Sequence, residues 1–148
     1  MSQWRSPIFA AALCLTAGPG LAETNVDPTG VWLTEAGDAK IRISQCGPGI
    51  CGTVVWLKVA IDPATGKPQV DDKNTNPSLT RRPIVGINIF NGMKPVAEHK
   101  WSGRIYNADN GKTYSSDVSL LGPRKLEVRG CVMALLCGGE TWTKIAGM

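Results

Sequence analysis

Short segments in which apolar and polar residues alternate constrain the fold of this chain more than any other feature. Ile41 and Ile43 flank Arg42, and Leu126 and Val128 stand in the same arrangement further along. A period of two is typical of half-buried β-strands, whereas a long amphipathic helix would show a period of 3.6. Because no convincing long helix is found, the sequence predicts an all-β protein.

Turn-forming residues divide the chain into about eight predicted strands. The segments with strand character are 30–34, 40–44, 50–57, 84–90, 100–106, 113–120, 125–129 and 141–145. Asn91-Gly92 is interpreted as a turn, and Asp109-Asn110-Gly111 is the strongest hairpin signal, because Asn and Gly tolerate a positive φ. An antiparallel meander of this kind can close into a barrel without exposed edges. A two-sheet sandwich is the alternative.

Residues 58–82 carry few apolar anchors and many turn formers, and they predict one long loop with a helical turn near Ser78 to Thr80. Long loops in compact domains tend to be functional or mobile. With 148 residues in all, the chain is long enough for one ordinary domain.

Residues 1–22 have the features of a secretory signal peptide. Arg5 supplies a positive start, residues 8–16 are apolar, and Gly20 and Ala22 are small residues suited to a cut after Ala22. A membrane anchor is the alternative, but the apolar run is short for a bilayer of about 30 Å. The predicted organisation is therefore a signal peptide over 1–22 and a single barrel domain over 23–148, in the periplasm or secreted.

Removal of the leader leaves four cysteines, Cys46, Cys51, Cys131 and Cys137. An even number in a small exported domain indicates disulfides. Of the three possible pairings we expect the local one, because each local pair brackets a short turn-like segment. A four-cysteine zinc site is the alternative, and its spacings match structural zinc motifs poorly.

The charge of the chain argues against nucleic acid as a partner. The formal net charge of +4 falls to +3 once Arg5 is removed, and no basic run is longer than Arg81-Arg82. Nucleic-acid-binding proteins usually cluster their cations on one face or helix. No transmembrane segment is expected after cleavage, and the modest positive charge leaves an envelope protein or an anionic surface as candidate partners.

Several motifs together resemble a family of exported bacterial proteins called domain of unknown function 2147. They are Gly30-Val31-Trp32, Cys46-Gly47, Cys51-Gly52, Val55-Trp56, Asn76-Pro77, Arg81-Arg82-Pro83, Gly86, Trp101, Gly103, Ile105-Tyr106, Gly111-Lys112, Tyr114, Leu126, Val128-Arg129-Gly130-Cys131 and Thr141-Trp142. The resemblance covers about residues 28–146. It implies a calycin or lipocalin-like barrel and no agreed activity.

Gly30-x-Trp32 also resembles the opening strand of lipocalins, in which the tryptophan closes the barrel floor. Lipocalins often stack an arginine near the last strand over this tryptophan. Here Lys144 stands on the last predicted strand, and Arg129 lies one strand earlier.

The residues that could carry catalysis or bind metal do not form a convincing constellation. His99 is the only histidine, and no serine or reduced cysteine is placed beside it. The pair Asp71-Asp72 lies in a hydrophilic loop. The run from Asp72 through Asn74 and Asn76 resembles the start of a calcium loop, but prolines replace the glycine and the glutamate that such a loop needs. We therefore predict a protein that is not an enzyme and has no metal or cofactor.

The main functional prediction is a barrel that binds a small apolar or amphipathic molecule. The candidate ligand-binding residues are Trp32, Trp56, Trp101 and Tyr114 as pocket walls and Arg81 or Arg82 as partners of an acidic head group. Both arginines could instead pair with Asp71 and Asp72 and fasten the long loop. The alternative function is an envelope interaction or structural module, with the tryptophans filling the core.

Overall fold

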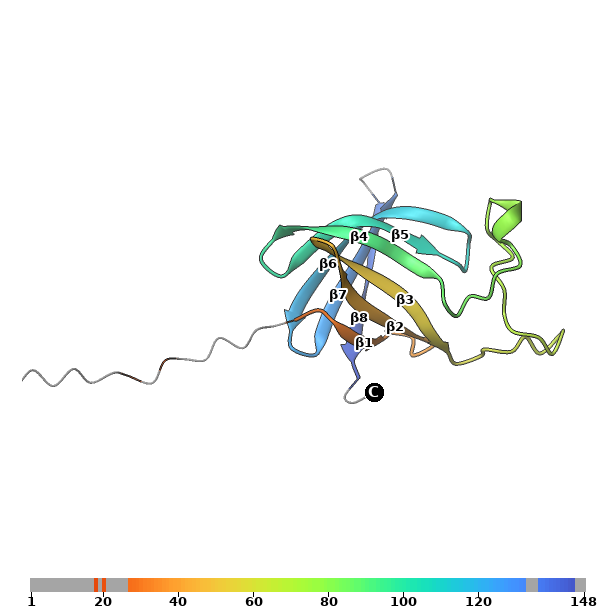
Figure 1. The fold of residues 1–148 in the computed structure, drawn as a ribbon, viewed down its shortest axis with the longest axis horizontal. Helices are drawn as coiled ribbons and strands as arrows, with labels where there is room; N and C mark the ends of the chain where they lie inside the picture. The colour runs from red at the N-terminus through yellow and green to blue at the C-terminus, as the bar shows by residue number, and fades with distance from the viewer. Residues whose placement is uncertain (1–17, 19, 21–26, 133–135, 146–148) are drawn as a thin grey trace, which may run out of the picture.

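The computed structural model of this protein describes residues 27–132 and 136–145, together with Gly18 and Gly20. Eight β-strands form one closed antiparallel barrel in the order of the sequence (Figure 1). The strands are β1 (Gly30–Leu33), β2 (Ala39–Cys46), β3 (Gly49–Leu57), β4 (Asn88–Ala97), β5 (Lys100–Asn107), β6 (Lys112–Gly122), β7 (Lys125–Val132) and β8 (Leu136–Lys144). This architecture confirms the all-β, eight-stranded barrel that the alternating segments predicted.

The up-and-down connections give the barrel two different ends. We call the end that carries the β1–β2, β3–β4, β5–β6 and β7–β8 connections the open end, and the opposite end the closed end. The first described residues before β1 lie at the closed end, where Lys144 Nζ donates a hydrogen bond to the carbonyl of Asp27 and lies 5.3 Å from the centre of the Trp32 ring. Lys144 of β8 therefore lies over the ring of the tryptophan of β1.

Large apolar side chains fill the closed half of the barrel. The most deeply buried are Trp32, Ile43, Ile50, Phe90, Met93, Val118 and Leu126. Two glycines make room for them, because a Cβ on Gly52 would overlap the Phe90 ring and one on Gly103 would lie 2.9 Å from Cγ of Met93. The inward positions of this half are therefore occupied by buried apolar side chains.

Strand β4 differs from the prediction at both ends. It begins at Asn88 and runs through Asn91-Gly92, which the sequence analysis took as a turn. Gly92 has a φ of 71°, and the pairing of β3 with β4 shifts between Ile50 and Gly52, so this glycine forms a β-bulge within the strand. The β4–β5 turn lies instead at Glu98-His99, where His99 has a φ of 56°.

Strand β8 is longer than expected, because it begins at Leu136 and not at Thr141. The long loop predicted over residues 58–82 is present and continues to residue 87, because β4 begins only at Asn88. We call residues 58–87 the long segment, and it includes the 3-10 helix η1 (Pro77–Leu79), close to the predicted helical turn. The Asn110-Gly111 hairpin joins β5 to β6 as predicted, with Gly111 at a φ of 71°.

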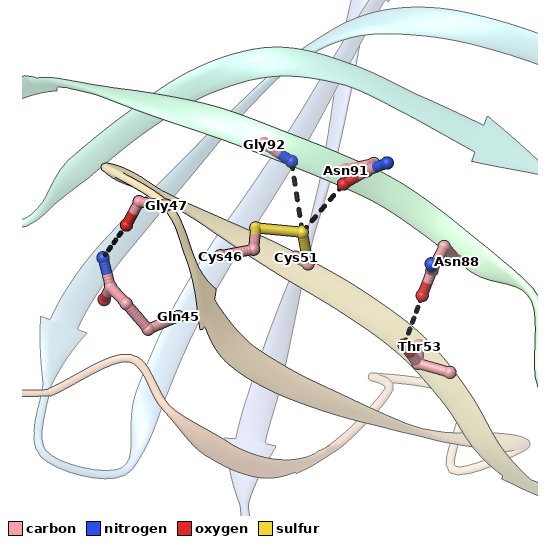
Figure 2. The surroundings of a disulfide bond; sticks show 8 residues. All are labelled: Gln45, Cys46, Gly47, Cys51, Thr53, Asn88, Asn91 and Gly92. Atoms are coloured by element: carbon pink, nitrogen blue, oxygen red, sulfur yellow. Dashed lines mark hydrogen bonds between the residues drawn. A yellow bond between two sulfur atoms is a disulfide. The ribbon is translucent and has the colours of Figure 1, made fainter.

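The two disulfides of the structure are the local pairs Cys46–Cys51 and Cys131–Cys137. Cys46–Cys51 spans the β2–β3 turn at the closed end, and the backbone N–H of Gly92 in the β4 bulge donates a hydrogen bond to Cys51 Sγ (Figure 2). Cys131 and Cys137 are directly opposite each other in β7 and β8, near the open end. The two disulfides therefore reinforce opposite ends of the barrel.

The predicted signal peptide lies outside the described residues, apart from Gly18 and Gly20. It therefore stays a prediction. Within the part of the chain that the structure describes, no helix is long and apolar enough to cross a membrane.

Candidate functional site

The open half of the barrel contains a cavity of about 540 Å³. Its walls are formed largely by apolar side chains on the inward faces of the strands. They include Ile41, Val54, Leu57, Ile84, Ile89, Ile105, Val128 and Trp142. The cavity is within the size range of small-molecule sites, which are typically 300–1,000 Å³ and mostly apolar.

Glycines on the inward faces of β7 and β8 keep this half of the barrel hollow. Gly130 and Gly138 are directly opposite each other in the two strands, and both line the cavity. A Cβ on Gly138 would meet no atom within 4 Å. In the closed half, the side chains of Phe90 and Met93 occupy the space beside the glycines, whereas the space beside Gly138 is empty.

Trp142 and Glu140 share the inward face of β8 and lie at the inner part of the cavity wall. Trp142 is almost fully buried, and its indole N–H donates a hydrogen bond to Oε1 of the half-buried Glu140. Ser116 on β6 is 5% exposed, and its Oγ has no hydrogen-bond partner among the described residues. The inward face of β6 carries Ser116 between Tyr114, which lines the cavity, and the core residue Val118.

The turn that follows β1 lies beside β8 at the wall of the cavity. Strands β1 and β8 pair only at Trp32↔Lys144 and Leu33↔Thr143. Beyond these pairs, the backbone N–H of Thr141 donates to the Glu35 carboxylate of the β1–β2 turn at 2.9 Å. Residues of the β1–β2 turn and of β8 line this part of the cavity together.

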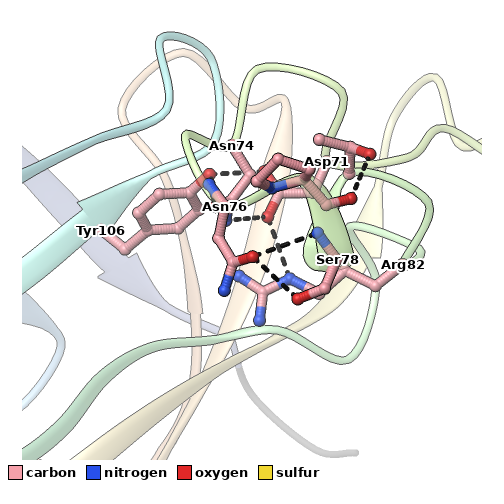
Figure 3. Close-up of polar contacts among 8 residues, drawn as sticks. Asp71, Asn74, Asn76, Ser78, Arg82 and Tyr106 are labelled. Carbon is pink, nitrogen blue, oxygen red and sulfur yellow. Dashed lines mark hydrogen bonds and ion pairs between the residues drawn. The ribbon is translucent and has the colours of Figure 1, made fainter.

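The long segment projects past the open end and is fastened to β5 through one buried carboxylate (Figures 1 and 3). Asp71 is fully buried and accepts hydrogen bonds from Tyr106 Oη at 2.6 Å, from Asn74 Nδ2 at 2.8 Å and from Arg82 Nε at 2.9 Å. The segment also packs closely on the β5–β6 turn, because a Cβ on Gly111 would overlap the carbonyl of Lys73.

The electrostatics of this contact favour an ionised Asp71. Burial alone would raise the pKa of Asp71, but the hydrogen bonds from Tyr106, Asn74 and Arg82 and the charge of Arg82 hold its pKa below the ordinary value. Burial and the neighbouring Asp71 carboxylate raise the pKa of Tyr106. The tyrosine therefore remains a donor and the aspartate an acceptor across the neutral pH range.

The charged side chains around the cavity are all acidic within the described residues. Asp38 and Asp109 lie at its rim, and Glu140 lies on its wall, whereas no lysine or arginine of residues 27–132 and 136–145 lines it. Arg104 and Lys112 line an adjoining hollow of about 500 Å³ at β5, β6 and β7, which shares Tyr114 and Val132 with the cavity. The charged residues that line the cavity are thus carboxylates, whereas those that line the adjoining hollow are cations.

Comparison with known protein families tests the family resemblance that the sequence motifs suggested. Residues 30–144 match the family DUF2147, described as "Uncharacterized protein conserved in bacteria". This chain belongs to that family. No curated protein matches the chain.

A solved structure shows that the DUF2147 chain has a lipocalin-like fold. Protein HP1028 from Helicobacter pylori, described as belonging to the lipocalin family, is 19% identical and superposes with a TM-score of 0.68. The match covers 82% of this chain and 84% of that protein. At this identity the likeness concerns the fold alone.

Of the six ligand-binding residues predicted from the sequence, Tyr114 lines the cavity of the DUF2147 barrel. Trp32 is fully buried in the closed half, where its Nε1 donates to the carbonyl of Pro28 at 2.8 Å. Trp101 packs against the same core. Trp56 is 37% exposed, with Lys40 Nζ 4.6 Å from the ring centre, so it lies away from the cavity.

The two arginines are not cavity residues either. Arg81 is exposed, and Arg82 forms the ion pair with Asp71, which was the structural alternative for these arginines. The side chains that resembled a calcium loop have local roles, since Asn74 donates to Asp71 and Asn76 caps η1 through Ser78 (Figure 3). In the described residues, no three His, Cys, Asp or Glu side chains are grouped as metal ligands.

His99 is half exposed at the β4–β5 turn of the closed end, far along the barrel from the cavity, and its Nε2 lies 3.9 Å from the exposed carboxylate of Glu98. Its positive φ explains its place in the chain as a turn residue.

Sequence reasoning missed Glu140, Gly138 and Gly130 as site residues. The signal that could have found them is the alternation from Gly138 through Glu140 to Trp142, which continues the inward face of the last strand. It was overlooked because two adjacent glycines are more typical of a turn than of a strand.

Proposed function

We propose that this DUF2147 barrel binds a small apolar or amphipathic molecule in the cavity of its open half. The observation that carries the proposal is a cavity of about 540 Å³ with apolar walls in a barrel whose other half is filled. Lipocalin folds typically bind small hydrophobic ligands, and apolar cavities of this size are the usual sites for them. The lipocalin-like fold of the chain agrees with this function.

The proposed place of action is the periplasm or the extracellular space. Disulfides persist in oxidising compartments and are rare in the cytosol. Two disulfides and the signal-like residues 1–22 support export.

The direct test compares two glycine substitutions in the exported protein. Gly138→Leu would place a side chain in the cavity, whereas Gly122→Leu is a matched control, because Gly122 also has open space around its Cβ but lies at the closed end. Titration with decanol by calorimetry should show binding to the wild type and to Gly122→Leu, and at least about tenfold weaker binding to Gly138→Leu. Equal affinity in all three proteins would contradict a site in this cavity.

Native mass spectrometry of the wild type, purified without detergent from a periplasm, adds a test without a chosen ligand. We expect a co-purified small molecule that is absent from Gly138→Leu and retained by Gly122→Leu. The intact mass would also report the cut site and both disulfides.

A second candidate function is an envelope interaction module, for which the long segment gives a specific observation. Val59, Ile61 and Val85 are each more than two-fifths exposed on or beside this segment. Exposed apolar side chains of this kind are typical of contact surfaces. Replacing the three by serine should abolish cross-linking to an envelope partner in cells while decanol binding stays unchanged, if this surface is the functional one.

A further inference from the structure

We propose that the ligand of the cavity is an amphipathic cation, an alkyl or aryl amine whose ammonium group contacts Glu140. This inference rests on the proposed function, because it names the chemical class of the molecule that the cavity takes. It is carried by the position of Glu140, by an unpartnered buried hydroxyl, and by the distribution of charge around the cavity.

Glu140 is a carboxylate built into an otherwise apolar wall. It is half-buried on the inward face of β8, and one of its oxygens accepts the hydrogen bond of the Trp142 indole. Among the described residues no cation forms an ion pair with it, because the ion pairs there involve Asp71, Glu98 and Asp117. A carboxylate held in this way has lone pairs left for a donor from the ligand.

Ser116 gives a second and independent indication of a polar partner in this half of the barrel. Its Oγ is buried without a hydrogen-bond partner in the described residues, although buried polar groups are nearly always paired. Ser116 lies directly opposite Gly130, and its neighbour on the inward face of β6 is Tyr114, both of which line the cavity. Ser116 does not itself line the cavity, so it marks an unpaired polar group next to the cavity wall.

The remaining charges of the cavity oppose an anionic ligand. Asp38 and Asp109 stand at the rim, and no lysine or arginine of the described ranges lines the cavity to neutralise them. Residues 133–135, next to the lining residues Val132 and Leu136, are Met, Ala and Leu and bring no charge of their own. An acidic head group would therefore be repelled, whereas an ammonium group would be attracted.

Aromatic side chains in the cavity wall also favour a cationic ligand. Trp142 and Tyr114 both line the cavity, and the faces of aromatic rings attract ammonium groups electrostatically. The apolar walls described above would hold the hydrocarbon part of the same molecule. An amine with an apolar body fits the chemistry of both parts.

The test uses three probes of equal chain length on the full exported protein, namely decylamine, decanol and decanoate. At neutral pH the amine is protonated, as lysine is. Calorimetry should rank decylamine about tenfold tighter than decanol, and decanol about tenfold tighter than decanoate, since each tenfold step corresponds to one modest charge interaction. Raising the salt concentration should weaken the binding of decylamine and leave the affinity for decanol unchanged.

Two isosteric substitutions locate the effect. Glu140→Gln keeps an oxygen that accepts from Trp142 and removes the charge, so decylamine should lose about tenfold in affinity and decanol should keep its affinity. Glu127→Gln is the matched control, because Glu127 is on the neighbouring strand β7, opposite Thr141, on the face away from the cavity. It should change neither affinity.

The outcomes separate the two proposals. If none of the three probes binds, the proposed function fails, and this inference fails with it. If decanol binds but decylamine binds no more tightly, or if Glu140→Gln leaves the preference for decylamine intact, only the cationic ligand is overturned. Should Glu140→Gln not fold, the ranking of the three probes and its salt dependence in the wild type decide the question alone.

Discussion

Asp71 is the single residue on which the attachment of the long segment most depends. In Asp71→Asn the NH₂ group of the new amide would face the N–H groups of Asn74 or Arg82, which also donate. At least one hydrogen bond must therefore be lost. Because a buried donor left without a partner is costly, we expect a loss of about 2 kcal/mol in the free energy of unfolding. Urea denaturation measures it. Asp72→Asn is the control, since Asp72 is exposed, and an equal loss there would contradict the argument.

The same residue predicts a dependence of stability on pH. The pKa of Asp71 in the folded protein lies below its ordinary value of 3.8, so its contribution is complete above that value and disappears as the pH falls through the folded pKa. The difference in unfolding free energy between the wild type and Asp71→Asn should therefore be constant down to about pH 5 and narrow below it. Asp27 and Asp117, whose pKa values are also lowered, are present in both proteins and cancel. A difference that widens in acid would contradict the sign.

At the scale of elements, strand β4 depends on the bulge at Gly92. The φ of 71° strains any residue with a Cβ, although open space surrounds the position. Gly92→Ala should therefore destabilise the protein by about 1 kcal/mol, and Gly92→Asn by less, because asparagine tolerates the left-handed region better. Urea denaturation of the two variants measures the order. Equal losses, or a larger loss for Gly92→Asn, would contradict the argument that backbone conformation limits this position.

The strands could be predicted largely from local patterns, and the failures have physical reasons. Asn110-Gly111 and Asn91-Gly92 are the same dipeptide and both glycines take a positive φ, yet one forms a hairpin and the other a bulge. The choice depends on the pairing of β4 with β3 and on the contact of Gly92 with Cys51, neither of which local sequence encodes. The alternation of apolar and polar residues therefore predicts the existence of a strand more reliably than the position of the turns that end it.

The candidate site was less predictable than the fold, because the cavity depends on which inward positions are small at one end of the barrel. Tyr114 was anticipated as a cavity residue, whereas Trp32 and Trp101 pack in or against the filled core. Gly130 and Gly138 hollow the open half only because the register of β7 with β8 places them opposite each other. A pattern of aromatic residues cannot distinguish a residue that fills a core from one that lines a cavity.

At the scale of the whole molecule, the barrel divides into a half that provides stability and a half that holds the cavity. Each half has its own disulfide, with Cys46–Cys51 at the closed end and Cys131–Cys137 near the open end. Each closes a short loop, for which the expected contribution is about 2 kcal/mol. Because the two bonds share no partners, their contributions should add when both are removed.

This division predicts that the two disulfides differ in their effect on binding although they resemble each other in their effect on stability. Replacing Cys131 and Cys137 by serine should loosen the β7–β8 hairpin, whose residues Gly130, Val132 and Gly138 line the cavity, and so weaken decanol binding severalfold. Replacing Cys46 and Cys51 by serine should lower the unfolding free energy by a similar amount and leave the affinity unchanged, because that bond lies at the filled end. Urea denaturation and calorimetry on both variants measure the two quantities on the same samples. If both variants lost affinity equally, the two halves would be coupled through the barrel, and the separation of a stabilising half from a binding half would be wrong.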